Sequence, residues 1–311
     1  MLTEDKSVCC IGGITLDRTL LLDEHAIPGT SNPARSHHSC GGVARNVAEN
    51  LARLSVGCQL IGVVGDDEAG RAVIGETAAQ GVDTSLVVTR KEGATSSYSA
   101  ITQPDGELVI GVADMDICES IDRQIIDSNW EHIAAATIVF SDTNLPADTL
   151  AYLFERCQKS EMRLYVDAVS VPKAEKLPKN LSAIETLFCN FEEARAILGD
   201  GVDADDTKAC VNALTRRGAA NVVVTVGADG LWCANEDECD FLPASSTDVV
   251  DVSGAGDALI AGTLFGRLMG KEPITSCKMG LKAASMTIGS VGRHCPDLSV
   301  DTIMEGVALD G

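Results

Sequence analysis

Short runs of consecutive apolar residues alternate along this chain with longer segments whose apolar residues recur at helical spacing. The apolar runs predict strands buried on both faces, at residues 7–14, 58–64, 137–140, 163–166, 186–189 and 221–226. The longer segments predict helices at residues 43–54, 70–80, 147–158, 192–198, 207–216, 255–269 and 274–288. Steady alternation of strand and helix predicts an α/β fold, with a mostly parallel sheet and helices on both faces. Ligands of such sheets bind at the carboxyl ends of the strands.

Two segments break this alternation and predict a second, smaller sheet. Residues 15–40 and 93–114 contain short segments of alternating polarity with turn signals between them. The pair Asp105-Gly106, flanked by two strand-like runs, is a strong hairpin signal. We expect these segments to form a β lid over the ligand end of the main sheet, within one domain that spans residues 1–311. Ordinary surface loops are the alternative, although long loops without structure are uncommon in compact domains.

Composition excludes several classes of protein. The chain has 311 residues, of which 45% are hydrophobic and 23% charged, and no apolar run reaches the roughly 18 residues of a transmembrane helix. Its 24 Lys and Arg against 46 Asp and Glu give a net charge of −22, which argues against nucleic-acid and membrane partners. The acidic start lacks a secretory signal, so we expect a cytoplasmic protein. The 12 Cys include no C-x-x-C pair, so we expect most of them to be buried and free rather than zinc ligands.

The strongest chemical signal is the segment 251–257, DVSGAGD, which comes immediately before a predicted helix. Gly254, Ala255 and Gly256 leave backbone N–H groups accessible at a helix start, where the helix dipole favours an anion such as phosphate. Asp257 beside that site could accept a proton from an attacking hydroxyl group. The alternative is that Asp257 is only an acidic residue favoured in the first helical turn.

Two other phosphate-binding motifs are absent. A dinucleotide-binding G-x-G-x-x-G would need Gly or Ala where Leu259 stands, and it would follow the first strand rather than lie late in the chain. No G-x-x-x-x-G-K-[ST] segment occurs either. The phosphates of a bound nucleotide therefore need a holder other than a P-loop lysine.

A second signal, Gly41-Gly42, comes directly before the predicted helix at 43–54. Paired glycines allow the backbone to approach a ligand closely, and Asn46 one turn later can both donate and accept hydrogen bonds. This combination suits a small polyol. A plain turn at the start of a helix is the alternative.

Together, residues 41–55 and 251–257 closely resemble the two signature segments of the PfkB, or ribokinase-like, family of carbohydrate and nucleoside kinases. Further similarity lies in Gly12-Gly13 followed by Asp17, in an N-x-x-E motif at 190–193, and in a nucleotide-loop segment at 225–230. The resemblance extends over essentially the whole chain. It implies a ribokinase-like three-layer α/β/α core with a β lid, the cofactors ATP and Mg²⁺, and transfer of the γ-phosphoryl group to a primary hydroxyl.

The resemblance also implies a role for individual residues. Asp257 would be the catalytic base, and Gly254, Ala255 and Gly256 would form the anion hole. Substrate-binding residues would be Thr15, Asp17, Gly41, Gly42, Asn46, Ser97, Asp114 and Asn144. The nucleotide would contact Asn190, Thr225, Gly227, Gly230, Gly254 and Gly256. Mg²⁺ would be held by Glu193, and by Asn190 through water, with a candidate monovalent cation site, for K⁺, near Asp251 and Ser253. Asn190 and Glu193 could instead be a strand end and a first-turn acid, and Asp17 a turn residue.

Within the family the chain is most similar to pseudouridine kinases. The similarity lies in residues 95–98, 114–117, 142–144, 167–170 with Lys173, and 296–299. Two departures are Ala168, where proline is expected, and Cys189, where many relatives have proline. The implied reaction phosphorylates the 5′-hydroxyl of pseudouridine and releases ADP.

Pseudouridine keeps a base N–H that uridine lacks, so its selection requires a hydrogen-bond acceptor. Candidates to read the base are Ser96, Ser97, Asp114, Asp116 and Asn144; ordinary hairpin and strand-end polarity is their alternative explanation. Other sugar or nucleoside kinases of this fold (ribokinase, adenosine or inosine/uridine kinase) and a non-catalytic nucleoside-binding protein remain alternatives. Open lid edges favour a homodimer that pairs through the lid.

Overall fold

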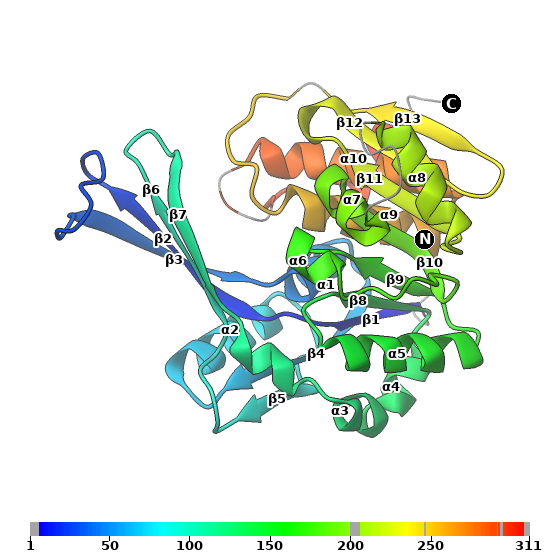
Figure 1. The fold of residues 1–311 in the computed structure, drawn as a ribbon, viewed down its shortest axis with the longest axis horizontal. Coiled ribbons are helices and arrows are strands. Elements are labelled where there is room, and N and C mark those ends of the chain that lie inside the picture. Colours follow the sequence, from blue (N-terminus) through cyan, green and yellow to red (C-terminus); the bar gives the residue numbers. More distant parts are fainter. Residues whose placement is uncertain (1–5, 200–205, 246, 291, 293–294, 308–311) are drawn as a thin grey trace.

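The computed structural model describes residues 6–199, 206–245, 247–290, 292 and 295–307 (Figure 1). Its largest element is a nine-stranded sheet in the order β13-β12-β11-β10-β9-β8-β1-β4-β5. The strands from β11 to β5 are all parallel, and β12 and β13 extend one edge as an antiparallel hairpin. The bounds are β1 Ser7–Ile11, β4 Gly57–Gly65, β5 Val87–Arg90, β8 Ile138–Asp142, β9 Leu164–Asp167, β10 Ile184–Asn190, β11 Asn221–Thr225, β12 Gly230–Ala234 and β13 Cys239–Pro243.

Helices pack on both faces of this sheet and form two apolar cores. Along β1, Val8 and Cys10 belong to one core, and Cys9 and Ile11 belong to the other. The continuous apolar run predicted from the sequence therefore serves both faces of one strand. One core includes α1 Val43–Arg53, α2 Glu68–Ala79, α9 Ala255–Leu268, α10 Pro273–Ile288 and α11 Val300–Val307; the other includes α3 Arg123–Ser128, α4 Trp130–Ala135, α5 Ala147–Lys159, α6 Val171–Ala174, α7 Phe191–Leu198 and α8 Thr207–Arg216.

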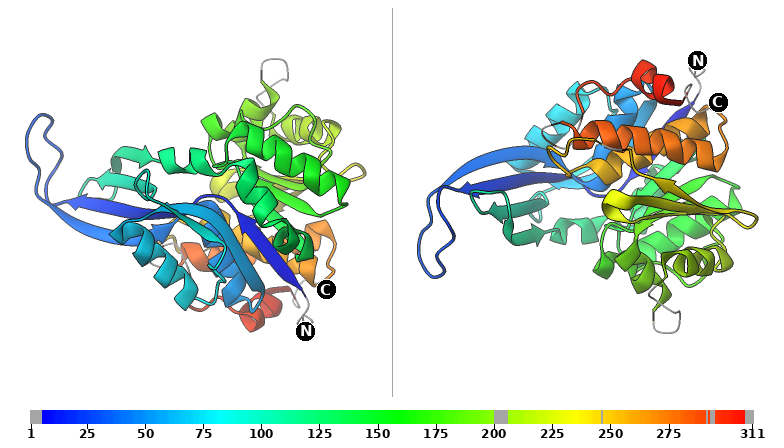
Figure 2. Two further views of the ribbon diagram at one scale, coloured as in Figure 1. Left: turned by 90° about the horizontal axis from the view of Figure 1, so that it is seen from below. Right: turned by 90° about the horizontal axis from the view of Figure 1, so that it is seen from above.

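A separate four-stranded sheet, which we call the lid, projects from the ligand end of the main sheet (Figures 1 and 2). Its strand order is β3-β2-β6-β7, with bounds β2 Thr15–Leu22, β3 Ala34–Gly41, β6 Ser97–Thr102 and β7 Leu108–Asp114. The expected hairpin is present, because β6 and β7 pair antiparallel around a turn in which the Gly106 N–H donates to the Gln103 carbonyl at 2.9 Å. Gly106 has a φ of 92°, which only glycine adopts readily. The α/β architecture with a smaller separate sheet is confirmed.

Most predicted elements lie within a few residues of the observed ones, with one instructive difference. The strand expected to continue to residue 14 ends at Ile11: the Gly12 N–H still donates to the Ile61 carbonyl of β4 at 3.0 Å, but the Gly13 N–H donates to the Asp142 carboxylate instead, at 2.9 Å. All twelve cysteines are free and all but Cys239 are buried, as expected. In the part of the chain that the structure describes, no helix is both long and apolar enough to cross a membrane.

Candidate functional site

Helix α9 begins at the ligand end of the main sheet with an uncapped N-terminus. Its N-cap residue, Gly254, has a φ of 77°, and no side chain caps the helix. An added Cβ at Gly256 would meet no atom within 4 Å, so this glycine faces open space. The first-turn N–H groups of a helix have no partner within the helix and carry its positive end. The geometry at Gly254, Ala255 and Gly256 therefore suits an anion.

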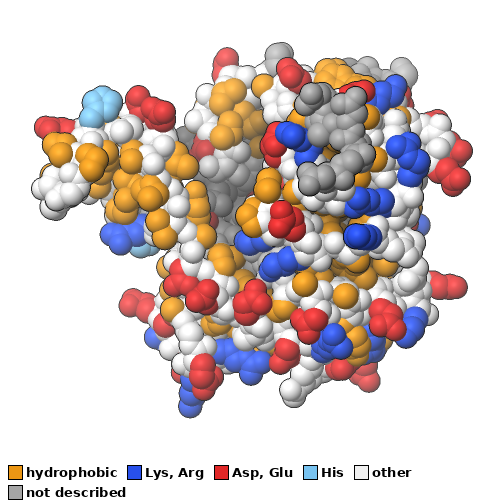
Figure 3. All heavy atoms as spheres, in the orientation of Figure 1, with side chains coloured by type: hydrophobic (Ala, Val, Ile, Leu, Met, Phe, Trp, Pro, Cys, Tyr) orange, Lys and Arg blue, Asp and Glu red, His pale blue; other side chains and the backbone are white. Residues whose placement is uncertain are grey.

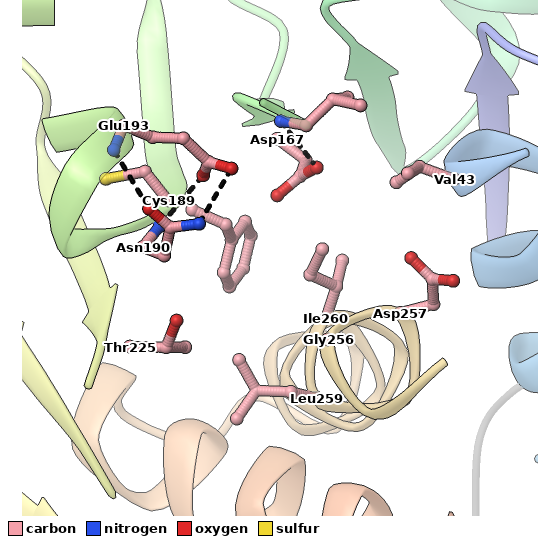
Figure 4. Close-up of a pocket in the computed structure, with 12 residues that line it drawn as sticks. Val43, Asp167, Cys189, Asn190, Glu193, Thr225, Gly256, Asp257, Leu259 and Ile260 are labelled. Atoms are coloured by element: carbon pink, nitrogen blue, oxygen red, sulfur yellow. Dashed lines mark hydrogen bonds between the residues drawn. The ribbon is translucent and has the colours of Figure 1, made fainter. Parts of the chain in front are cut away.

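A cavity of about 200 Å³ lies between α9 and the ends of β9, β10 and β11 (Figure 4). We call it the catalytic cavity. Figure 4 shows the Asp167 and Asp257 side chains on opposite sides of the same space. It brings together five residues named from the sequence: Asn190, Glu193, Thr225, Gly256 and Asp257.

Asn190 and Glu193 form a reciprocal cap at the start of α7. The Asn190 Oδ1 accepts from the Glu193 N–H at 2.9 Å, and the Glu193 carboxylate accepts from the Asn190 backbone N–H and Nδ2, both at 2.9 Å. Asn190 ends β10 and Glu193 is a first-turn acid of α7, as the simpler explanation proposed; together they cap the helix, and they also line the cavity. Burial raises the pKa of the Glu193 carboxyl above its usual value, although the Asn190 N–H acts in the opposite direction.

Asp167, at the end of β9, is a cavity residue that the sequence analysis did not assign to the site. Its Oδ2 accepts from the Val169 N–H at 3.0 Å. Desolvation, followed by the negative charges of Glu193, Asp257 and Asp142, raises the pKa of Asp167 well above its usual value. A signal for it exists in the sequence, because the acid directly follows the apolar run 163–166 at the carboxyl end of a parallel strand.

The paired glycines before α1 are explained by close backbone contact. Gly42 has a φ of 96°, and an added Cβ would lie 2.2 Å from the Gly13 carbonyl oxygen. A Cβ at Gly41 would lie 2.3 Å from the Asp17 carboxylate and 2.7 Å from the Thr15 hydroxyl, both of which are buried on β2. The start of α1 therefore packs directly on the loop between β1 and β2. This contact places four of the predicted substrate-binding residues together.

Asp142, at the end of β8, fixes these segments and was not assigned to the site from the sequence. Its Oδ2 accepts from the backbone N–H groups of Gly13 and Ala44, each at 2.9 Å, and its Oδ1 accepts from the Asn144 N–H at 2.9 Å. Asn144 packs against Gly13, and its Oδ1 accepts from Lys173 Nζ at 2.5 Å. One carboxylate thus joins the β1–β2 loop, the start of α1 and the end of β8.

The two signature segments meet at a hydrogen bond. Asn46 Nδ2, in the first turns of α1, donates to Asp257 Oδ2 at 2.8 Å. These residues are 211 positions apart in the chain. The predicted acceptor-binding amide is therefore in direct contact with the predicted base.

Four predicted residues lie away from this contact. Ser97 and Asp114 are partners in the β6–β7 pairing of the lid, where Ser97 is half-buried and Asp114 is exposed. Asp251 and Ser253 form a turn before α9, in which the Ser253 N–H donates to Asp251 Oδ1 at 2.8 Å.

A larger cavity of about 460 Å³ adjoins the catalytic cavity, and the two share Thr225, Gly256 and Leu259. We call it the nucleotide cavity. Its walls are mostly apolar, with Val249, Val252, Ala255, Leu281, Ala284 and Ile288 among them. Gly227 and Gly230, both predicted from the sequence, line it as well. An apolar cavity next to an anion site matches the two halves of a nucleotide.

Comparisons with known proteins agree with this geometry. The pfkB family carbohydrate kinase domain matches residues 5–297. The chain is 31% identical to the uncharacterized sugar kinase YeiI of Escherichia coli strain K12, over 99% of this chain and 85% of that protein. It is 29% identical to the pseudouridine kinase of the same organism, over 97% of this chain and 96% of that protein. The solved structure of a carbohydrate kinase from Agrobacterium tumefaciens is 34% identical and matches with a TM-score of 0.86, covering 98% of this chain and 97% of that one. The expected ribokinase-like fold is confirmed. The chain belongs to the pfkB family of carbohydrate kinases, phosphotransferases that act on an alcohol group of a sugar or nucleoside.

Proposed function

We propose that this protein transfers the γ-phosphoryl group of ATP to the 5′-hydroxyl of pseudouridine, giving pseudouridine 5′-phosphate and ADP. The observation that carries the proposal is the 2.8 Å hydrogen bond between Asn46 and Asp257 at the uncapped start of α9. It joins a hydroxyl-binding segment, a candidate base and an anion site at one point. The choice of pseudouridine is supported by the similarity to the pseudouridine kinase over nearly the full length of both chains.

Asp257 acts as the base in this proposal. Its carboxylate accepts the proton of the 5′-hydroxyl as the hydroxyl oxygen attacks the γ-phosphorus, and the bond from that phosphorus to the leaving oxygen of ADP breaks. The first-turn N–H groups of α9 stabilise the negative charge on the transferred group. Asn46 holds the Asp257 carboxylate in place while this occurs.

ATP would lie across the two adjoining cavities. The apolar nucleotide cavity accommodates the adenine, and the shared wall at Thr225 and Gly256 leads its phosphates toward α9. Gly256 is suited to this position, because any side chain there would project into the open space beside the phosphates.

The acidic residues of the catalytic cavity fit a magnesium ion held through water. Asp167 and Glu193 lie beside the expected polyphosphate, and after desolvation the negative charge of Glu193 is among the causes that raise the pKa of Asp167, so a cation there would relieve charge repulsion. Within the described ranges, no three acidic, Cys or His side chains are placed to ligate a metal directly. Mg²⁺ commonly keeps several waters and binds through few protein groups and phosphates, so Glu193 and Asn190 would hold it. When bound, it would neutralise phosphate charge. K⁺ near Asp251 and Ser253 stays a prediction.

A coupled assay of ADP release tests the substrate. The panel is pseudouridine, uridine, adenosine, ribose and fructose 6-phosphate, and we expect kcat/KM to be highest for pseudouridine. Turnover of ribose without turnover of pseudouridine would overturn the substrate and favour a different kinase of this family. Binding of nucleosides without any turnover would favour a non-catalytic binding protein.

A single substitution tests the base separately. Asp257→Asn keeps the shape of the side chain but removes its ability to accept the proton, so turnover should be lost while ATP binding persists. Asp122→Asn, which changes a capping carboxylate of α3 away from the cavity, is the matched control. An active Asp257→Asn variant would refute the assignment of the base.

We also propose that two copies pair through their lids. The edge strand β7 exposes Leu108, Val109, Ile110 and Val112, and Figure 3 shows apolar side chains gathered on the lid. An open apolar edge is a natural surface for pairing with an identical strand. Sedimentation should show a dimer that Leu108→Ser, Ile110→Ser and Val112→Ser together convert to a monomer, and a monomeric parent protein would contradict the proposal.

A further inference from the structure

Behind Asn46, on the side away from Asp257, lies a buried ion pair. Arg45 and Glu49 are one turn apart on α1, and each side chain is only 3% exposed. Arg45 also donates from Nε to the Thr77 hydroxyl of α2 at 3.0 Å, and from Nη1 to Asn46 Oδ1 at 3.1 Å. The Glu49 carboxylate of α1 and the Thr77 hydroxyl of α2 therefore hold the Arg45 guanidinium against the oxygen of the Asn46 amide.

This contact determines which end of the Asn46 amide faces the base. A guanidinium can only donate hydrogen bonds, and an ionised carboxylate can only accept them. With Oδ1 against Arg45, the Nδ2 donor faces Asp257, which is the observed arrangement. The flipped amide would set a donor against Arg45 and an oxygen against the carboxylate, and both contacts would be unfavourable. The order Arg45, Asn46, Asp257 is thus directional.

We infer that Arg45 is a positioning residue for the phosphoryl transfer, which acts by locking the Asn46 amide so that it holds the Asp257 carboxylate. The inference rests on the proposed role of Asp257 as base. A buried ion pair contributes little net stability compared with apolar packing. Its place directly behind the residue that contacts the base gives the pair a function in orientation.

A separate cavity gives access to this residue from the back of α1. It has a volume of about 320 Å³, is lined by Arg45 and Glu49 together with residues of β3 and α2, and shares no lining residue with the catalytic cavity. A guanidinium ion supplied in solution can therefore reach the space that the Arg45 side chain leaves when it is truncated. This makes chemical rescue a direct test.

The experiment compares Arg45→Ala with Arg53→Ala. Arg53 is the matched control. Its Nη2 contacts the carboxylate that also pairs with Arg45, at 2.8 Å from Glu49 Oε1, whereas the Asn46 amide oxygen accepts its hydrogen bond from Arg45. Arg45→Ala should lower kcat roughly tenfold to 100-fold with the KM for ATP unchanged. Guanidinium chloride at low concentration should restore much of the lost kcat, whereas sodium chloride at equal ionic strength should not. Arg53→Ala should retain the parent kcat and show no response to guanidinium.

A second variant keeps the inference testable if Arg45→Ala does not fold. Arg45→Ala with Glu49→Gln removes both charges, so no buried carboxylate loses its partner, and the same loss of kcat and the same rescue are expected. Parent-level kcat in either folded variant would overturn the inference. A loss of kcat that guanidinium fails to restore in both variants would overturn it as well. Asp257→Asn is measured alongside. If it is active, the proposed base fails; if it is inactive while Arg45→Ala is fully active, only the positioning role fails.

Discussion

The Asp142 carboxylate offers a quantitative test of how the fold holds the acceptor side of the site. It accepts three backbone hydrogen bonds, from Gly13, Ala44 and Asn144, each 2.9 Å long. The side chain is fully buried, so water cannot replace it as an acceptor. Asp142→Ala would leave three buried N–H groups without their partner.

The loss of stability expected for Asp142→Ala follows from the number of these hydrogen bonds. A buried donor left without a partner costs about 1–3 kcal/mol, so three cost about 3–9 kcal/mol. That is comparable with the whole stability of a folded domain, about 5–15 kcal/mol. Asp142→Asn is therefore the informative change. Its single amide oxygen can serve both Gly13 and Ala44 in place of Oδ2, while its NH₂ group would oppose the Asn144 N–H. One of the three bonds is lost, and we expect destabilisation of about 1–3 kcal/mol.

Two measurements separate stability from function. Urea unfolding gives the loss of stability, and steady-state kinetics give KM for the acceptor and for ATP. Because the lost bond positions Asn144, a predicted acceptor-binding residue, the acceptor KM should rise and the ATP KM should not. Asp122→Asn is the control, since its carboxylate accepts one bond, from the Ile125 N–H at 3.0 Å, on α3. Unchanged stability of Asp142→Asn, or a rise confined to the ATP KM, would refute this reasoning.

Three further outcomes are expected. The pKa of Asp167 is raised in the folded state, so the protonated carboxyl favours the folded protein. That stabilisation is lost as pH rises through the folded pKa. Asp167→Asn should therefore melt at a higher temperature than the parent near neutral pH, with the difference vanishing below about pH 4; equal melting at neutral pH would contradict this. Gly256→Val should weaken ATP binding in calorimetry without changing the melting temperature, because its Cβ meets open space; Gly75→Val, also open but on α2, is the control, and unchanged affinity would count against the nucleotide cavity. Chelation of divalent metal should lower ATP affinity in the parent protein, and affinity insensitive to chelation would argue against a metal held at Glu193 and Asn190.

The sequence was sufficient for the core of the fold and insufficient for its edge. Buried parallel strands produce continuous apolar runs, so all but one of the parallel strands were predicted. The exception, β5 Val87–Arg90, has only four residues, too few to show a pattern. The hairpin β12–β13 was also missed, because acidic residues 236–238 form its turn and β13, which contains Asp240, is mostly exposed. Edge strands need fewer apolar residues than central ones.

The site divides in a similar way between local and long-range features. Gly256 and Asp257 were proposed because glycines at a helix start have a local signature, and Asn190 was proposed from the resemblance to the family. Asp142 and Arg45 act through contacts that a local pattern cannot reveal. Asp142 reaches Gly13 and Ala44 only because β8 lies beside β1, although the strands are more than one hundred residues apart. An acid that ends a predicted parallel strand was nevertheless a usable signal for Asp142 and Asp167.

The distribution of charge explains how such an acidic protein can bind a polyphosphate. The net charge of −22 is not offset within the site, where the described lining of the catalytic and nucleotide cavities includes Asp167, Glu193 and Asp257 and no Lys or Arg. The described residues of the two walls supply no positive side chain, so among them the helix dipole of α9, together with a bound cation, balances phosphate charge. A neutral acceptor is favoured for the same reason, since an acceptor that already carried phosphate would add negative charge beside the acidic residues of the described lining. The acidic surroundings thus favour a nucleoside or free sugar over a sugar phosphate, which agrees with the proposed acceptor.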